Sequence, residues 1–180
     1  MISSVGVIGA GQMGAGIAQV CAAIGRKVIL CDIKQEFVDN GIGTITKNLK
    51  RSVSKERINQ DEMDNTLGKV STTLELNDLK DCNIIIEAIV ENIDIKKKLF
   101  LDLGNICNKD TILASNTSSI PIGILAEASG RPSKVVGMHF MNPVPVMKLV
   151  EVIRAKSTAD HTFEATFKLA EDLNKVPVLV

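Results

Sequence analysis

The sequence predicts an α/β fold in which helices cover both faces of a doubly wound, mostly parallel sheet. Short β-branched apolar runs alternate with longer segments of helical spacing along the 180 residues, which is the pattern of such sheets. Polar side chains follow most of the apolar runs, and ligands of these folds bind beyond the carboxyl ends of the strands. We therefore expect one ligand-binding domain over residues 1–180, with a core supplied by its 45% hydrophobic content.

The first turn of this fold is a glycine-rich stretch, Gly9-Ala10-Gly11-Gln12-Met13-Gly14, between an apolar run and a segment of helical spacing. Gly9 permits a tight turn, Gly11 lets the backbone approach a pyrophosphate, and Gly14 allows a helix to pack closely on a strand. The helix N-terminus then offers free N–H groups to the phosphates. The stretch, with Gln12 and Met13 included, predicts a dinucleotide site in a Rossmann-type fold; the alternative is a glycine turn that binds nothing.

The second apolar run, residues 27–31, ends in Asp32, eighteen residues after Gly14. An acidic side chain at this place accepts hydrogen bonds from the ribose hydroxyls of the adenosine half. Because it also disfavours the extra 2′-phosphate of NADP, we expect NAD as the cofactor, with NADP less favoured. Lys34 lies close enough in the sequence to keep that choice open.

The other elements follow in chain order. A helical insert after the second strand covers residues 37–53 and 59–67, and it is longer than a minimal crossover. The remaining strands are expected at residues 69–71, 83–88, 111–114, 135–138, 148–153 and 176–180. The remaining helices are one with Ile95, Leu99, Leu103 and Ile106 on one face, a short one with Pro121 in its first turn, and one over residues 162–173.

Composition excludes several classes of protein. Lysine plus arginine equals aspartate plus glutamate, at 21 each, and Trp and Tyr are absent, so we expect neither a nucleic-acid partner nor a membrane surface. No apolar run reaches the length of a membrane span, and the first strand starts too near Met1 for a targeting peptide. The four cysteines form no C-x-x-C pair and resemble buried apolar side chains. These features predict a cytoplasmic protein, and we assign it no metal ion.

Two polar residues near the end of the chain have the make-up of an acid/base pair. His139 ends a predicted strand, and Glu151 lies in an otherwise apolar alternating strand. A buried carboxylate needs a partner, and a neighbouring carboxylate fixes the tautomer of an imidazole and favours its protonated form. The pair would act as a general acid/base; the alternative is a structural, hydrogen-bonded histidine. Ser118 or Ser119 would bond a substrate oxygen, unless that loop serves only as a turn and helix cap.

Four segments of the chain resemble the L-3-hydroxyacyl-CoA dehydrogenase family, and most closely its bacterial 3-hydroxybutyryl-CoA branch. They are VGVIGAGQMGAGIAQV, IIIEAIVENIDIKKKLF, ILASNTSSI and GMHFMNPVPVMKLVEVI. The resemblance covers essentially all 180 residues. It implies that His139 is the catalytic base, that Glu151 is the carboxylate paired with it, and that Ser118 contacts both the 3-oxygen of the substrate and the cofactor.

The resemblance also implies the binding residues. Asp32 matches the ribose-binding acid, and positions near the nicotinamide half of NAD are matched by Glu91, Lys96 and Asn142. Asn48 and Lys55 match positions that contact the adenine-phosphate end of coenzyme A. By itself the basic stretch of residues 47–57 indicates only a solvated helix face, but coenzyme A gives it an anionic target.

The implied activity is the reversible, NAD-dependent interconversion of (S)-3-hydroxyacyl-CoA and 3-oxoacyl-CoA, such as 3-hydroxybutyryl-CoA and acetoacetyl-CoA in butyrate and fatty acid metabolism. Family members continue into a C-terminal helical dimerisation domain, which is absent from these 180 residues, so we expect a fragment whose full-length form is a homodimer. One alternative is a catalytically impaired NAD-binding module of the same lineage. Another is a 3-hydroxy acid enzyme with the same glycine motif, although such enzymes typically use a lysine base.

Overall fold

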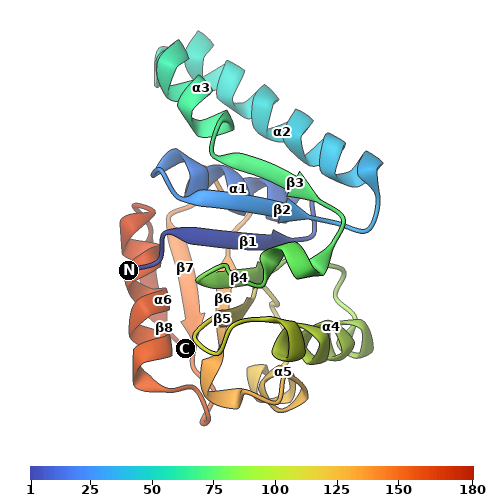
Figure 1. Ribbon diagram of the computed structural model, residues 1–180. Coiled ribbons are helices and arrows are strands. Elements are labelled where there is room, and N and C mark those ends of the chain that lie inside the picture. The colour runs from blue at the N-terminus through green and yellow to red at the C-terminus, as the bar shows by residue number, and fades with distance from the viewer.

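The computed structural model describes all 180 residues, and a single sheet forms its centre. The strands are β1 (Ser4–Ile8), β2 (Lys27–Cys31), β3 (Val70–Thr73), β4 (Ile84–Glu87), β5 (Ile112–Ser115), β6 (Val135–Phe140), β7 (Leu149–Ile153) and β8 (Val176–Leu179). Their order is β3-β2-β1-β4-β5-β6-β7-β8 (Figure 1). All neighbours pair in parallel except β6 and β7, which are antiparallel. The prediction of a doubly wound, mostly parallel sheet is confirmed.

Helices cover both faces of the sheet. They are α1 (Gln12–Ala23), α2 (Gln35–Ser54), α3 (Gln60–Leu67), α4 (Ile93–Ile106), α5 (Ile122–Ala128) and α6 (Asp160–Asp172), with short 3-10 turns at Leu76–Leu79 and Pro132–Lys134. The core on one face includes side chains of α1, α2, α3 and α6, and the core on the other includes side chains of α4 and α5. In Figure 1, α6 accordingly lies to the left of the lower part of the sheet and α4 and α5 to its right.

The central strands are buried because both of their faces are covered. Ile84, Ile85 and Ile86 of β4 are all at most 1% exposed, as expected for a parallel strand that reads as one continuous apolar run. All four cysteines are buried and unpaired, which confirms that they serve as apolar side chains. None of the helices has the length and apolar character needed to cross a bilayer.

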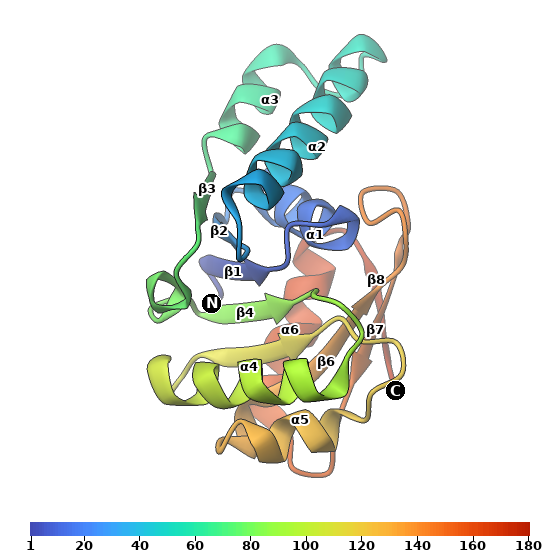
Figure 2. The ribbon, with the colours of Figure 1, turned by 90° about the vertical axis from the view of Figure 1, so that its right-hand side faces the viewer.

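The predicted helical insert forms α2 and α3, which project as a pair beyond β3 (Figure 2). Val38, Ile45 and Leu49 are the buried apolar face of α2. The start of α3 is fixed by a capping box, in which Asn59 accepts a hydrogen bond from the Glu62 N–H and Glu62 accepts one from the Asn59 N–H. The insert is therefore a well-defined pair of helices that lies beside the glycine turn.

The buried face of α4 differs from the expected one. We expected Ile95 to share a face with Leu99, Leu103 and Ile106, but Ile95 is 49% exposed and Lys96 is 1% exposed. The buried stripe is instead Lys96, Leu99, Phe100 and Leu103. The prediction for Ile95 was wrong because the buried face of α4 begins with a lysine, Lys96, and not with an apolar residue. Hydrophobic periodicity cannot indicate a buried lysine. Pro121 immediately precedes α5 and does not lie in its first turn.

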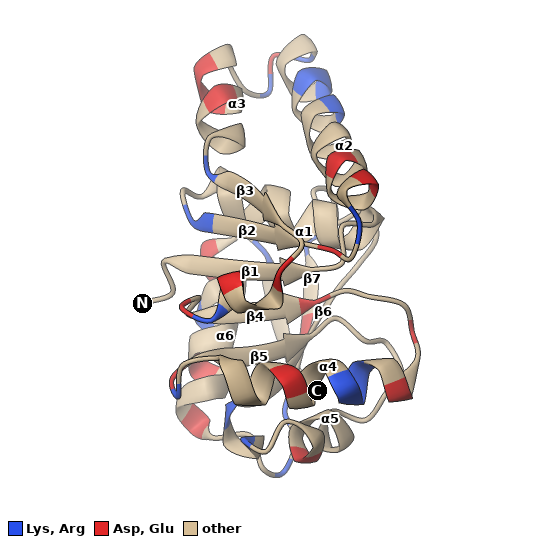
Figure 3. Cartoon of the chain, turned by 45° about the vertical axis from the view of Figure 1, so that its right-hand side comes forward, with Lys and Arg blue, Asp and Glu red and all other residues tan.

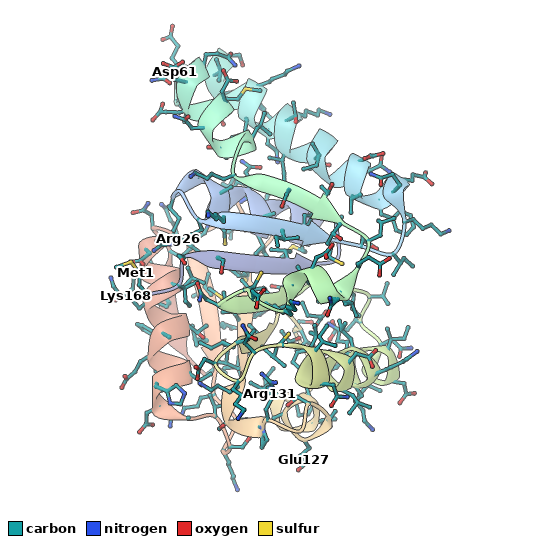
Figure 4. All side chains as sticks on the ribbon, viewed as in Figure 1. Met1, Arg26, Asp61, Glu127, Arg131 and Lys168 are labelled. Carbon is teal, nitrogen blue, oxygen red and sulfur yellow. The ribbon has the colours of Figure 1, made fainter.

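Several arginine and lysine side chains fasten helix ends (Figure 4). The Arg131 guanidinium donates hydrogen bonds to the carbonyl oxygens of Gly104, Cys107 and Asn108 at the end of α4. These carbonyls have no partner within the helix. Arg26 and Lys168, which lie near one another in Figure 4, both pair with Asp172 of α6.

Candidate functional site at the carboxyl edge of the sheet

The chemistry-bearing side chains gather at one edge of the sheet. Strands β1, β2, β4, β5 and β6 are parallel, so the residues after them meet at the same edge. These residues are Gly9, Asp32, Ala88, Asn116 and Met141 with the segments that follow them. The predicted clustering of polar side chains at this edge is confirmed.

The glycine turn has the geometry that a dinucleotide requires. Gly9 has φ +99°, and a Cβ atom on it would lie 2.5 Å from the Ala88 carbonyl oxygen. A Cβ atom on Gly14 would lie 1.7 Å from the Gly9 carbonyl oxygen, so α1 packs too closely on the turn for any side chain. A Cβ atom on Gly11 would meet nothing within 4 Å. Gly11 is therefore the point where a ligand can approach the backbone.

The N-terminus of α1 is open to an anion. Gly11, the residue that precedes the helix, offers no side-chain hydrogen bond, and the first turn contains no acidic residue. The first N–H groups of a helix lack partners within it, and together with the helix dipole they favour a phosphate. Gln12 and Met13 lie in this turn. The residues present therefore fit a pyrophosphate group.

Asp32 holds the glycine turn against β2. One of its carboxylate oxygens accepts a hydrogen bond of 2.7 Å from the Ala10 N–H, and the other accepts one of 2.7 Å from the Ile33 N–H. Asp32 lines a hollow of about 490 Å³ together with Gly9, Gly11, Phe37, Asn40, Val90 and Ile95. Lys34 sits 5.5 Å from the centre of the Phe37 ring at the rim. This hollow has the place and the apolar walls that an adenosine group requires.

A second hollow, of about 320 Å³, adjoins the first through Ala88 and Ile89, which line both. Most of the residues expected at the nicotinamide end and the reacting carbon line it, namely Glu91, Lys96, Ser118, His139 and Asn142, and Met13 of the glycine-rich stretch lines it too. The two hollows are therefore neighbours along the edge of the sheet, an arrangement that suits the two halves of a dinucleotide.

His139 and Glu151 stand directly opposite one another on β6 and β7. The His139 Nδ1 atom lies 2.8 Å from a carboxylate oxygen of Glu151, and the two side chains are 20% and 33% exposed. Because Nδ1 faces Glu151, Nε2 is the nitrogen that remains for a ligand. The pair exists because the turn after β6 returns the chain antiparallel in this register.

A charge network with two buried members lies at the second hollow, which Lys96 and Glu91 line. The Lys96 ammonium, 1% exposed, lies 2.8 Å from Glu87, which is fully buried, and 3.2 Å from Glu91. Glu87 also accepts hydrogen bonds from the Ser115 hydroxyl, at 2.6 Å, and from the Ile89 N–H, at 2.8 Å. Each buried charge therefore has a partner, as burial requires.

The network also holds the loop that contains Ser118. Glu91 accepts hydrogen bonds from the hydroxyls of Thr117 and Ser119 on either side of it. Burial raises the pKa of Glu91, but hydrogen bonds from Thr117 and Lys96 and the charge of Lys96 outweigh this and lower the pKa below its ordinary value. Asn116 accepts a hydrogen bond of 2.8 Å from the Phe140 N–H, which ties the same loop to β6.

A third hollow, of about 480 Å³, is basic. Asn48 and Lys55 line it, as do Gln19, Arg51, Ser52, Arg57, Pro143, Pro145 and Val146. The Asn48 side-chain amide donates a hydrogen bond of 3.1 Å to Gln19. Figure 3 shows Lys and Arg gathered at the far end of α2, which gives this hollow its positive charge.

Sequence reasoning left some of these residues without a role. Glu87 and Thr117 belong only to the polar residues that follow predicted strands, with no role of their own, and Lys175 had no signal at all. Lys175 is 9% exposed and donates hydrogen bonds to the carbonyl oxygens of Val144 and Met147. Burial and the charge of Lys148 lower the pKa of Lys175. No cluster of three or more His, Cys, Asp or Glu side chains is arranged to hold a metal ion.

Comparison with known proteins agrees with this geometry. Residues 4–180 match the family described as 3-hydroxyacyl-CoA dehydrogenase, NAD binding domain. A probable 3-hydroxybutyryl-CoA dehydrogenase of Deinococcus radiodurans is 53% identical over 173 residues, covering 96% of this chain and 62% of the relative. A 3-hydroxybutyryl-CoA dehydrogenase of Clostridioides difficile is 46% identical over 172 residues, covering 96% and 61%.

Solved structures agree as well. The crystal structure of (S)-3-hydroxybutyryl-CoA dehydrogenase from Ralstonia eutropha superposes with a TM-score of 0.98 at 42% identity, over 100% of this chain and 64% of that one. The chain thus spans a little over 60% of the length of the relatives it matches. With its glycine turn, its two joined hollows and this match over 177 of 180 residues, the chain belongs to the NAD-binding domain family of the 3-hydroxyacyl-CoA dehydrogenases.

Proposed function

We propose that the protein containing this chain interconverts (S)-3-hydroxyacyl-CoA and 3-oxoacyl-CoA with NAD as cofactor, and that 3-hydroxybutyryl-CoA and acetoacetyl-CoA are its substrates. The observation that carries the proposal is the 2.8 Å His139–Glu151 pair, whose imidazole lines the same hollow as Ser118 and Asn142. A general acid/base beside a nicotinamide site is what the oxidation of an alcohol by hydride transfer requires. The names of the most similar relatives support the choice of substrate.

The hydride acceptor or donor would be supplied by NAD when it is bound. His139 removes the proton of the 3-hydroxyl through Nε2 in the oxidative direction and returns it to the 3-oxygen in the reductive direction. Glu151 holds the ring through Nδ1 and stabilises the imidazolium that forms. Ser118 donates a hydrogen bond to the same oxygen and so orients the substrate carbon, a contribution of the kind that positioning makes to catalysis.

The basic hollow is the proposed site for the adenine-phosphate end of coenzyme A. Asn48 and Lys55 line it with Arg51 and Arg57, and cationic side chains recognise phosphates. The loop after β6 separates this hollow from the one that contains His139, because Asn142 lines one and Pro143 the other. An acyl-CoA that crosses this loop would present its acyl end to His139.

The relatives are longer than this chain, and we propose that their remaining part closes over the acyl end and forms a homodimer. A cytoplasmic location is proposed because the four cysteines are unpaired, and disulfides are rare in that compartment.

The rate of NADH oxidation with acetoacetyl-CoA tests the proposal, on a form extended with the C-terminal part of the Deinococcus radiodurans relative. We expect His139→Asn to lower kcat by about 10²–10⁴-fold, the usual contribution of a general acid/base, with NADH affinity retained. His161→Asn is the matched control, because this exposed histidine contacts Lys134 far from the hollow, and its rate should stay unchanged. A His139→Asn variant with full activity would refute the proposal. An extended form that binds NADH but fails to oxidise it, whichever acyl-CoA is added, would support the binding-module alternative.

A further inference from the structure

Two carboxylates share one ammonium beside the hollow that contains His139. Lys96 Nζ lies 2.8 Å from Glu87 and 3.2 Å from Glu91. The pair of Lys96 and Glu87 is buried, whereas Glu91 exposes 42% of its side chain. The formal charges of the three groups add to minus one, and the uncompensated charge is on the side of the cluster that is open to a ligand.

The remaining partners of Glu91 do not neutralise this charge. They are the hydroxyls of Thr117 and Ser119, which donate hydrogen bonds but carry no charge. The other titratable pair that belongs to this region is His139 with Glu151, which adds no net positive charge to the hollow whether or not the imidazole is protonated. The hollow therefore has a negative electrostatic bias that the chain itself leaves in place.

The nicotinamide ring belongs in this hollow. Hydride transfer needs the reacting carbons about 3–3.5 Å apart, and His139 and Ser118, the groups proposed to meet the substrate carbon, both line it. The ring is cationic in NAD⁺ and neutral in NADH, so an excess negative charge beside it attracts only the oxidised form.

We propose that the Glu87–Lys96–Glu91 cluster discriminates between the redox forms of the cofactor and favours NAD⁺ over NADH. The inference rests on the proposed function only in placing the nicotinamide ring beside His139. Its consequence is a bias of the bound equilibrium toward reduction of the 3-oxoacyl group, because the cluster stabilises NAD⁺, the cofactor form that this reduction produces.

Calorimetric titration of this chain with NAD⁺ and with NADH tests the inference. Glu91→Gln keeps the size of the side chain and an acceptor oxygen for Thr117 and Ser119 but removes the charge. We expect the ratio Kd(NAD⁺)/Kd(NADH) to rise about fivefold, the scale of a partly exposed charge pair, and the rise to shrink when ionic strength is increased. Asp94→Asn is the matched control, because Asp94 is in the first turn of the same helix but does not line the hollow.

Equal weakening of both cofactor forms by Glu91→Gln would overturn the inference, since it would mean that Glu91 only bonds a group common to both. A change of the same size in Asp94→Asn would overturn it too, because any nearby charge would then suffice. If the unsubstituted chain bound neither form, this inference and the cofactor site would both fall. The Glu91→Gln variant could also raise Kd(NAD⁺)/Kd(NADH) as expected while the extended form is inactive with every acyl-CoA. That result would support the inference and contradict only the proposed function.

Discussion

Replacing Lys96 by methionine should destabilise the chain far more than an ordinary lysine substitution. The ammonium lies 2.8 Å from Glu87, and both side chains are at most 1% exposed. At that distance the attraction is about 6 kcal/mol for an effective dielectric constant of about 20. Much of it offsets the cost of burying the charges, but removing one partner leaves the other buried and uncompensated, which costs about 3–5 kcal/mol.

Urea and thermal unfolding followed by circular dichroism measure this cost. For a chain of this length about 3–5 kcal/mol corresponds to a fall in Tm of about 10 °C. Lys97→Met, a neighbouring substitution at an exposed position, should stay within about 0.5 kcal/mol of the unsubstituted chain.

A double variant separates the unpaired charge from simple loss of packing. Glu87→Gln combined with Lys96→Met removes both charges and keeps an acceptor oxygen for the Ile89 N–H. It should recover about half or more of the loss, because apolar or neutral replacement of a whole buried pair costs far less than breaking it. If the double variant is as unstable as Lys96→Met alone, the electrostatic argument is refuted and the loss comes from the packing of the methionine side chain.

The structure makes three further predictions. Gly14→Ala should abolish NADH binding and lower the free energy of unfolding in urea by about 3 kcal/mol, since its Cβ would lie 1.7 Å from the Gly9 oxygen. Gly43→Ala, with open space around it, should instead stabilise the chain by about 0.5–1 kcal/mol. Equal effects of the two substitutions would contradict the packing argument. Burial raises the pKa of Cys21 to about 12 and of the other three thiols to about 11. The folded chain therefore keeps its thiols neutral where the unfolded chain ionises, so the contribution of the thiols to the free energy of unfolding should be constant below about pH 8 and fall from there toward pH 12. Lys175→Met should lower the free energy of unfolding by about 1–3 kcal/mol and raise the rate of proteolysis in residues 142–147, since the Val144 and Met147 oxygens lose their donor. Lys148→Met should have neither effect. An unchanged proteolysis rate in Lys175→Met would show that the loop is held by other contacts.

The features that sequence reasoning found are those that backbone geometry dictates. Gly9 and Gly14 are glycines because a Cβ at either position would meet backbone oxygen within 2.5 Å, and such a requirement leaves the same signature in any sequence. The strand runs were equally clear, because β4 is buried on both faces and tolerates only apolar residues in its interior.

The features that it missed depend on tertiary placement. The spacing of apolar residues on α4 gave no reason to put Lys96 inside, since a buried lysine is exceptional without a partner. The partner, Glu87, is nine residues away on β4, and only the arrangement of β4 and α4 brings the two within 2.8 Å. His139 and Glu151 were paired in advance because a buried carboxylate needs a partner, but their opposition rests on the register of β6 and β7, which residue spacing alone does not determine.

Four carboxylates lie at or near this edge of the sheet, and their donors distinguish their roles. Asp32 accepts hydrogen bonds from backbone N–H groups of the turn that it holds, and Glu87 and Glu91 share the Lys96 side chain. Glu151 alone is paired with a histidine, the side chain that ordinarily exchanges a proton near neutral pH. The first three are therefore placed to hold the turn, to pair with Lys96 or to attract a ligand. Only the pair on β6 and β7 contains an imidazole, which is why we assign the chemistry to His139 and the selection of the cofactor to the cluster around Lys96.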